Sequence, residues 1–233
     1  MSEESHIVKS YEEELQNLHD TLIQMGALTE SQLSDSLDAV IKVDKESTDK
    51  IINSDQKINK FRSKIDTQIM NLLVKRAPMA IDLRSTISAL KISQDLERIG
   101  DLAKSNAKKV KPLPYDLPDE LLQNLRRLGE LVQKQLSEVL DSYVNKGLDK
   151  AKTVWENDER VDDLTYIAMN SVTDFLSQDK KNLDFATHLI FVTKNLERAG
   201  DHITNIAESV YYLIKGEYLK GQRPKGREIE DNV

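Results

Sequence analysis

Two short segments of the chain carry paired carboxylates at a spacing suited to binding a cation. Residues 96–101 read LERIGD and residues 196–201 read LERAGD, so five of six positions agree at an offset of 100. In each copy a Glu and an Asp stand four residues apart, which places both on one face of a helix. Like charges at this spacing disfavour a helix by roughly 0.2–0.5 kcal/mol, and the Gly between them costs about 1 kcal/mol. A bound cation would offset the first penalty, and close approach of a neighbouring helix or ligand would explain the second.

Each acidic pair has an oxygen-rich partner pair on the preceding predicted helix. In an antiparallel helical hairpin, residues equally distant from the turn lie at the same height. The partner pairs and the repeated segments are centred on Pro78 in one half and on the junction of residues 179 and 180 in the other. Turns are predicted at both places. The predicted metal ligands are Asp55, Asn59, Glu97, Asp101, Asp158, Asp162, Glu197 and Asp201.

The type of donor restricts the metal and the chemistry. Oxygen ligands in a chain without Cys suit hard cations such as Fe, Mn, Mg or Ca, whereas Zn is less typical. A ferritin-like di-iron oxidase needs Glu-x-x-His on two helices, and only Glu3 and His6 match. Arg98 and Arg198 offer an alternative, in which they neutralise the carboxylates and leave only a salt-bridge network. His202 follows Asp201 and is expected either at the edge of the second site or on the ordinary surface.

Composition excludes several other classes of function. The net charge of −7 has both signs interspersed, so no basic face for nucleic acid is expected. The chain shows no Gly-rich phosphate loop and no catalytic triad, so these two enzyme signatures are missing. It shows neither an apolar stretch long enough to span a membrane nor an N-terminal signal core, and a cytoplasmic location is expected.

The elements that position these residues are predicted to be helices alone. Aromatic residues make up 5% of the chain and Gly and Pro are scarce, while apolar residues recur at spacings of three and four. We therefore predict an all-α fold of six long helices in two homologous halves with pseudo-twofold symmetry. The predicted helices cover residues 5–43, 47–75, 81–111, 118–145, 147–177 and 182–219.

Three prolines between residues 112 and 118 mark the predicted domain boundary, because Pro interrupts a helix. The first domain is expected to cover residues 1–112 and the second residues 116–220. The polar tail, residues 221–233, is expected to fray.

The repeated segments and their flanks resemble the two signatures of the PhoU family. The first signature is similar to DLR at 82–84, ALKIS at 89–93 and DLERIGDLA at 95–103. The second is similar to HL at 188–189, KNLERAGDH at 194–202 and NIAE at 205–208. The resemblance covers nearly the whole chain and implies two three-helix bundles in tandem, with metal clusters on the acidic motifs. Asn59 stands where the motif has an acid, which makes the first site less anionic, and Asn106 is displaced from the matching amide position and is not expected to be a ligand.

The resemblance also implies a role. Family members are regarded as negative regulators of high-affinity phosphate uptake and of the phosphate-starvation response, so the resemblance implies an adaptor that is not an enzyme. Their expected partners are the ATPase of the phosphate transporter and a phosphate-sensing histidine kinase, so that contact with the membrane occurs only through partners. The long amphipathic faces would suit a homodimer or a monomeric bundle. A metal-dependent phosphohydrolase and a purely structural helical protein are the alternatives.

Overall fold

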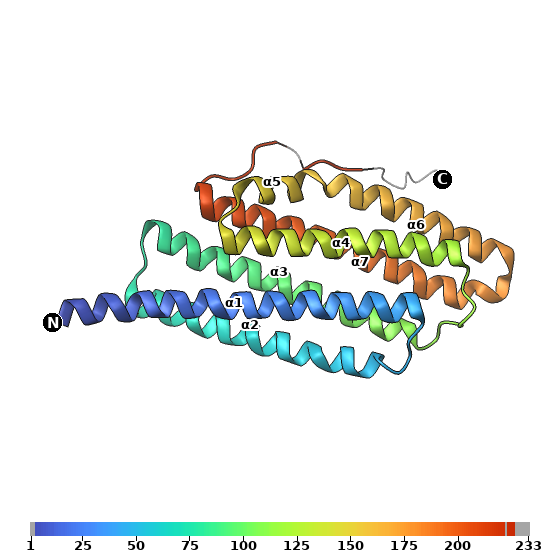
Figure 1. Cartoon of the computed structure of the whole chain (residues 1–233), viewed down its shortest axis with the longest axis horizontal. Coiled ribbons are helices and arrows are strands. Elements are labelled where there is room, and N and C mark those ends of the chain that lie inside the picture. Colours follow the sequence, from blue (N-terminus) through green and yellow to red (C-terminus); the bar gives the residue numbers. More distant parts are fainter. Residues whose placement is uncertain (1–2, 222, 227–233) are drawn as a thin grey trace.

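The chain folds into an elongated all-helical structure (Figure 1). The computed structural model describes residues 3–221 and 223–226, with side chains from residue 9 onward, so the side chains of Glu3 and His6 lie outside the described part. The elements are α1 (Glu3–Lys42), α2 (Thr48–Arg76), α3 (Ala80–Val110), α4 (Asp119–Asn145), α5 (Leu148–Glu156), α6 (Asp158–Gln178), the 3-10 helix η1 (Lys180–Asn182) and α7 (Leu183–Lys215).

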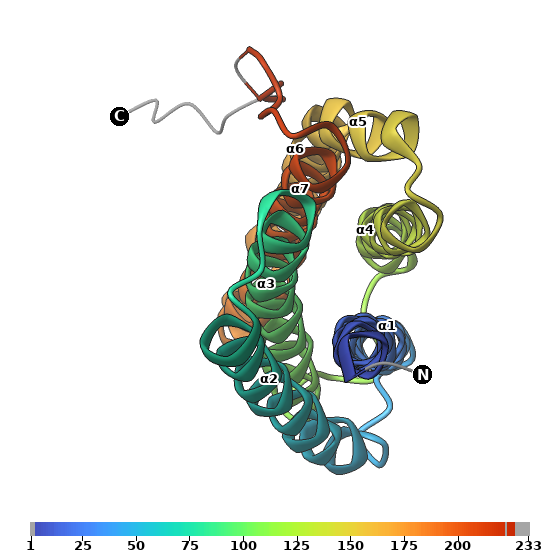
Figure 2. The ribbon, with the colours of Figure 1, turned by 90° about the vertical axis from the view of Figure 1, so that its left-hand side faces the viewer.

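The helices form two layers, which are seen end-on in Figure 2. Helices α2, α3, α7 and α6 lie side by side in a curved layer, and α1 and α4 cover its inner side. Helices α1, α2 and α3 make the first bundle, and α4 to α7 make the second. The largest contact between the bundles joins α3 to α7. The two repeated acidic segments therefore lie on adjacent helices in the middle of the structure, and the predicted pair of tandem bundles is confirmed.

The same contacts occur twice, which shows the internal symmetry directly. A Cβ on Gly26 of α1 would lie 2.7 Å from Leu140 of α4, and a Cβ on Gly129 of α4 would overlap Leu37 of α1. The two glycines are 103 positions apart, at 26 and 129, and so are the two leucines, at 37 and 140. The glycines allow α1 and α4 to approach closely, because any larger residue would displace the facing leucine.

The proline-rich connection between the halves is packed into the core. Leu113 and Leu117 are buried, although the segment carries three prolines between residues 112 and 118 and no helix forms there. The connection between α2 and α3 also follows the prediction. Ala77 takes a left-handed conformation with φ of 45° just before Pro78, and this ends α2.

Three features differ from the prediction. The expected fifth helix is broken at Asn157 into α5 and α6, because Asn157 leaves the helical conformation and its carbonyl accepts hydrogen bonds from Arg160 N and Gln135 Nε2. The last helix ends at Lys215 rather than near residue 219, because Gly216 adopts a left-handed φ of 77°. The tail was expected to fray, but residues 223–226 lie against α6 and α7.

Candidate metal centres

Close helix packing at the two repeated glycines brings the acidic residues of each half together. A Cβ on Gly100 would lie 2.9 Å from Ile58 of α2, and a Cβ on Gly200 would lie 3.0 Å from Val161 of α6. Ile58 and Val161 are themselves 103 positions apart. The glycines of the repeated segments thus permit close approach of the preceding helix, which is the packing role predicted for them.

The register of each hairpin is shifted by two to three residues from the prediction. Turn-centred spacing places Asp55 level with Asp101, but Asp55 accepts a hydrogen bond from Lys104. In the same way Asp158 accepts from Thr204 rather than lying level with Asp201. The shift is less than one helical turn and is the same in both halves. It brings position 104 or 204 into each site.

In the first half, Lys104 supplies the charge that balances Asp55. The Asp55 side chain is 1% exposed, and its Oδ2 accepts from Lys104 Nζ at 2.7 Å and from Asn59 Nδ2 at 3.1 Å. The hydrogen bond to Asp55 raises the pKa of Lys104, and the charges of Asp55, Asp101 and Glu97 add to this effect. The other oxygen, Oδ1, is buried and has no hydrogen-bond partner in the described part of the chain. This oxygen is an acceptor available to a ligand.

Glu97 and Asp101 lie beside this pair on the more exposed side of α3. Burial raises the pKa of Glu97, and the neighbouring charge of Asp101 raises it further. Arg98 approaches their carboxylates only to 3.8 and 3.7 Å and is 62% exposed, so its pairing with them is weak. The predicted ligands of the first half therefore lie near one another. Lys104 is paired with Asp55, and Arg98 is the nearest cation to Glu97 and Asp101.

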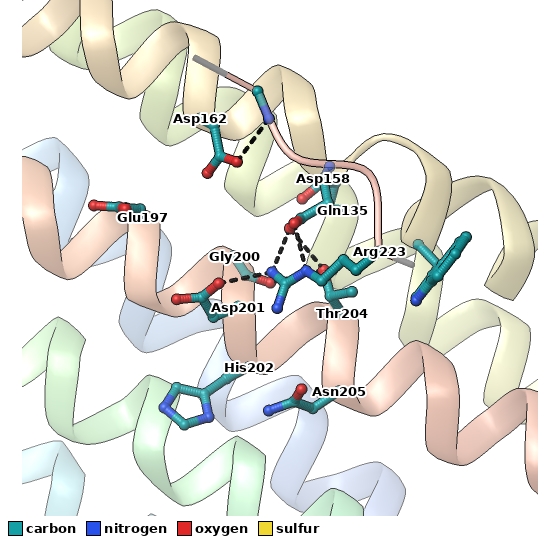
Figure 3. Close-up of polar contacts among 12 residues, drawn as sticks. Gln135, Asp158, Asp162, Glu197, Gly200, Asp201, His202, Thr204, Asn205 and Arg223 are labelled. Atoms are coloured by element: carbon teal, nitrogen blue, oxygen red, sulfur yellow. Dashed lines mark hydrogen bonds and ion pairs between the residues drawn. The ribbon is translucent and has the colours of Figure 1, made fainter. Parts of the chain in front are cut away.

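In the second half, Arg223 of the C-terminal tail takes the central place (Figure 3). Its guanidinium donates from Nε and Nη2 to the two oxygens of Asp158, and from Nη2 to Asp201 Oδ1 at 2.7 Å. Asp158 is 5% exposed in its side chain and also accepts from Thr204 Oγ1 at 3.0 Å. Burial lowers the pKa of Arg223, but the hydrogen bonds and charges of Asp158 and Asp201 outweigh this effect and raise it.

The remaining ligands of the second half are bound by other groups. Asp162 Oδ2 accepts from the backbone N–H of Gly226 at 3.0 Å. Burial raises the pKa of Asp162, against the effect of this hydrogen bond, and the neighbouring carboxylates raise it further. Glu197 accepts from Lys194 on the same helix at 2.5 Å. Arg198 is exposed, and in the described residues it forms no ion pair with these carboxylates.

His202 lies at the contact between the two halves instead of on the open surface. Its Nδ1 is 2.9 Å from Asp95 Oδ1 on α3, and the same oxygen accepts from Asn205 at 3.4 Å. At the symmetry-related place Asn195 donates to Ser105 at 3.0 Å, and also to the buried Asn106 at 2.8 Å. These polar contacts fix α3 against α7.

The oxygen donors suit a hard cation, but in the structure they pair with positively charged side chains of the protein itself. Among the residues that the structure describes, no three His, Asp or Glu side chains are grouped so that they could hold one metal ion. Lys104 pairs with Asp55 instead, and Arg223 bridges Asp158 and Asp201. Neither Lys104 nor Arg223 was predicted from the sequence, and Thr204 and Gln135 were not predicted either. The turn-centred register left position 104 outside the site, and no local pattern connects residue 223 with residue 158.

Comparison with known proteins agrees with this architecture. The family model of the PhoU domain matches residues 22–110 and 125–210, one match in each bundle. The accessory protein PhoU homolog of a phosphate-specific transport system from Caulobacter vibrioides is 40% identical over 94% of this chain and 96% of its own length. A homolog with the same description from Rhizobium meliloti is 37% identical over 95% of this chain and 94% of its own length.

Solved structures show the same fold. The crystal structure of PhoU from Pseudomonas aeruginosa superposes with a TM-score of 0.84 at 33% identity, covering 89% of this chain and all of that one. The crystal structure of the phosphate transport system regulatory protein PhoU from Streptococcus pneumoniae gives 0.82 at 30% identity, covering 90% of this chain and 99% of that one. No described helix has the length and apolar character needed to cross a membrane. With two matched domains and near full-length relatives, the chain belongs to the PhoU family.

Proposed function

We propose that this protein is a regulatory accessory component of high-affinity phosphate uptake, and that it represses uptake and the phosphate-starvation response when phosphate is abundant. The observation that carries the proposal is the near full-length similarity to relatives described as accessory proteins of phosphate-specific transport systems. The expected partners are the transporter ATPase and the phosphate-sensing histidine kinase, and the expected location is the cytoplasm.

The proposal includes divalent cation binding at the acidic clusters. Asp158, Asp162, Glu197 and Asp201 would hold the ion in the second half, and the corresponding residues would hold it more weakly in the first half. Carboxylate oxygens are the ligands that Mg²⁺, Mn²⁺ and Ca²⁺ prefer. A bound cation would supply positive charge to an acidic protein and would thereby present a cationic patch to a partner.

Deletion of the gene tests the regulatory role. In medium rich in phosphate, the deletion strain should express phosphate-starvation genes that the parent represses, and the intact gene should restore repression. Unchanged expression would contradict the proposal. A strain that carries Glu197→Gln with Asp201→Asn tests the cation separately, because full repression by this variant would show that the second cluster is not needed for signalling.

Purified protein distinguishes regulation from catalysis. We expect no turnover of phosphate esters with Mn²⁺ or Mg²⁺. Hydrolysis that Asp201→Ala abolishes would instead support a metal-dependent phosphohydrolase.

A further inference from the structure

The C-terminal tail turns back onto the bundle at two glycines. Helix α7 ends at Lys215, and Gly216 and Gly221 follow with φ of 77° and 110°, in the left-handed region that glycine adopts without strain. A Cβ on Gly216 would also overlap the guanidinium of Arg84. Figure 1 shows the tail running back beside α5 and α6. The tail therefore reaches the second acidic cluster from outside the bundle.

Three of the four predicted ligands in this cluster contact the tail. Arg223 pairs with Asp158 and with Asp201, and the N–H of Gly226 donates to Asp162. A Cβ on Gly226 would overlap the carbonyl oxygen of Glu159 and would lie 2.6 Å from Asp162 Cβ, so the backbone is packed directly on α6. Charged hydrogen bonds of this kind are stronger than neutral ones, and the guanidinium binds the Asp158 carboxylate through two N–H groups at once.

The positively charged side chain of the first half, Lys104, is held differently from Arg223. Lys104 belongs to α3, so it cannot leave Asp55 except by a change of its own side chain. The corresponding position of the second half is Thr204, which contributes a hydroxyl and no charge. The positive charge there comes instead from a segment beyond the last helix, which can detach without unfolding any helix.

An additional oxygen lies beside this contact. Gln135 of α4 is buried, and its Nε2 donates to the carbonyl of Asn157 at 3.1 Å, next to Asp158. Its Oε1 is buried and has no hydrogen-bond partner among the described residues. Figure 3 shows Gln135 next to Asp158 and Arg223. Gln32 repeats this arrangement in the first half, where it donates to the carbonyl of Ile51 and leaves its own Oε1 without a partner.

We propose that residues 223–226 form a strap that occupies the second acidic cluster, and that the strap and a divalent cation exclude one another there. The inference deepens the cation binding proposed above and rests on it. The oxygen lone pairs of Asp158 and Asp201 that accept hydrogen bonds from the guanidinium cannot coordinate a metal at the same time. A metal ion bound beside Arg223 would also be repelled by its positive charge. Cation binding is thereby coupled to the position of the C-terminal segment.

Calorimetric titration of the full chain with Mn²⁺ tests the exclusion. Arg223→Gln should bind Mn²⁺ at least about tenfold more tightly than the wild type, which corresponds to about 1.4 kcal/mol. Lys220→Gln is the matched control, because it removes one exposed positive charge from the same tail and should change the affinity by less than about twofold. Loss of binding in the variant with both Glu197→Gln and Asp201→Asn would assign the ion to this cluster.

Trypsin cleavage after Lys225 reports the strap itself. A protease needs an unpaired extended backbone, and the N–H of Gly226 is bound to Asp162. Cleavage of the wild type, followed by mass spectrometry, should be slow without metal and faster with Mn²⁺, whereas Arg223→Gln should be cleaved fast in both conditions.

The two parts of the inference fail in different ways. Equal Mn²⁺ affinity of the wild type and Arg223→Gln would overturn the strap and leave cation binding intact. Absence of Mn²⁺ binding in every variant would overturn cation binding, and the exclusion with it.

Discussion

Replacing Lys104 by Met would leave the buried carboxylate of Asp55 without its cation. Asp55 is 1% exposed, and its remaining hydrogen bond would be the one from Asn59 at 3.1 Å. Removing one partner of a buried ion pair costs roughly 3–5 kcal/mol, because the other charge stays buried and uncompensated. The Lys104 side chain is 28% exposed, so water can replace part of the lost interaction. We therefore expect Lys104→Met to lower the free energy of unfolding by about 2–4 kcal/mol.

A double variant separates the pair from the loss of the lysine stem. With Asp55→Asn and Lys104→Met together, both charges are gone and the cost should fall to about 1 kcal/mol. Urea denaturation with linear extrapolation gives each value. Lys108→Met, at an exposed position of the same helix, is the matched control and should stay within about 0.5 kcal/mol of the wild type. A cost of Lys104→Met no larger than that of the control would refute the reasoning.

The pH dependence of this difference provides a second check. The hydrogen bond to Asp55 raises the pKa of Lys104 in the folded state. The stabilisation is therefore fully present below the unfolded-state pKa of about 10.4, and it is lost as the pH rises through the folded-state pKa. The difference between wild type and Lys104→Met should be constant near neutral pH and should shrink only in strongly basic solution. A difference that shrinks near neutral pH would contradict this assignment.

Three further substitutions test the packing and the electrostatics. Gly129→Val should lower the free energy of unfolding by roughly 1–3 kcal/mol, because Leu37 fills the space that the new side chain needs. In urea denaturation, adding Leu37→Ala should recover part of this cost, and additive costs of the two changes would contradict the contact. Glu97→Gln should stabilise the metal-free protein by roughly 0.2–0.5 kcal/mol near neutral pH, since it removes a partly buried charge beside a like charge. Burial raises the pKa of Glu97, so this gain should vanish as the pH falls through that pKa, and a gain that persists in acid would refute the cause. His202→Leu should cost about 1 kcal/mol in the same assay because Asp95 loses its 2.9 Å partner, and a neutral result would show that the contact does not stabilise the interface.

The helices and turns were predictable because local signals determine them. Pro78 and the three prolines between residues 112 and 118 lie at the helix boundaries, and the apolar spacing between them predicted the ends of α1 to α4 to within a few residues. The break at Asn157 was not predictable in this way. The carbonyl of Asn157 accepts a hydrogen bond from Gln135, a residue of a different helix, and the sequence pattern around position 157 remains helical.

The acidic residues of the candidate sites were predictable as pairs, and their cations were not. The i, i+4 spacing and the repeat identified the carboxylates on one helix, and counting from the turn placed them near a partner pair. The count assumes a tight symmetric turn, and an error of two to three residues was enough to leave out Lys104. The contact of Arg223 with the cluster could not be predicted, because the position of Arg223 depends on how the chain leaves α7 at Gly216.

The inequality of the two halves has a different basis in the structure from the one that the sequence indicated. Asn59 in place of an acid predicted a weaker first site, since one carboxylate is missing. Lys104 has a larger effect, because it places a full positive charge 2.7 Å from Asp55, whereas the second half has the neutral Thr204 at the same position. A metal ion entering the first half would have to displace Lys104, which stays close because it is part of α3. In the second half it would have to displace only the strap, residues 223–226. On the proposed exclusion, the second cluster is therefore the one that is expected to respond to a change in cation concentration.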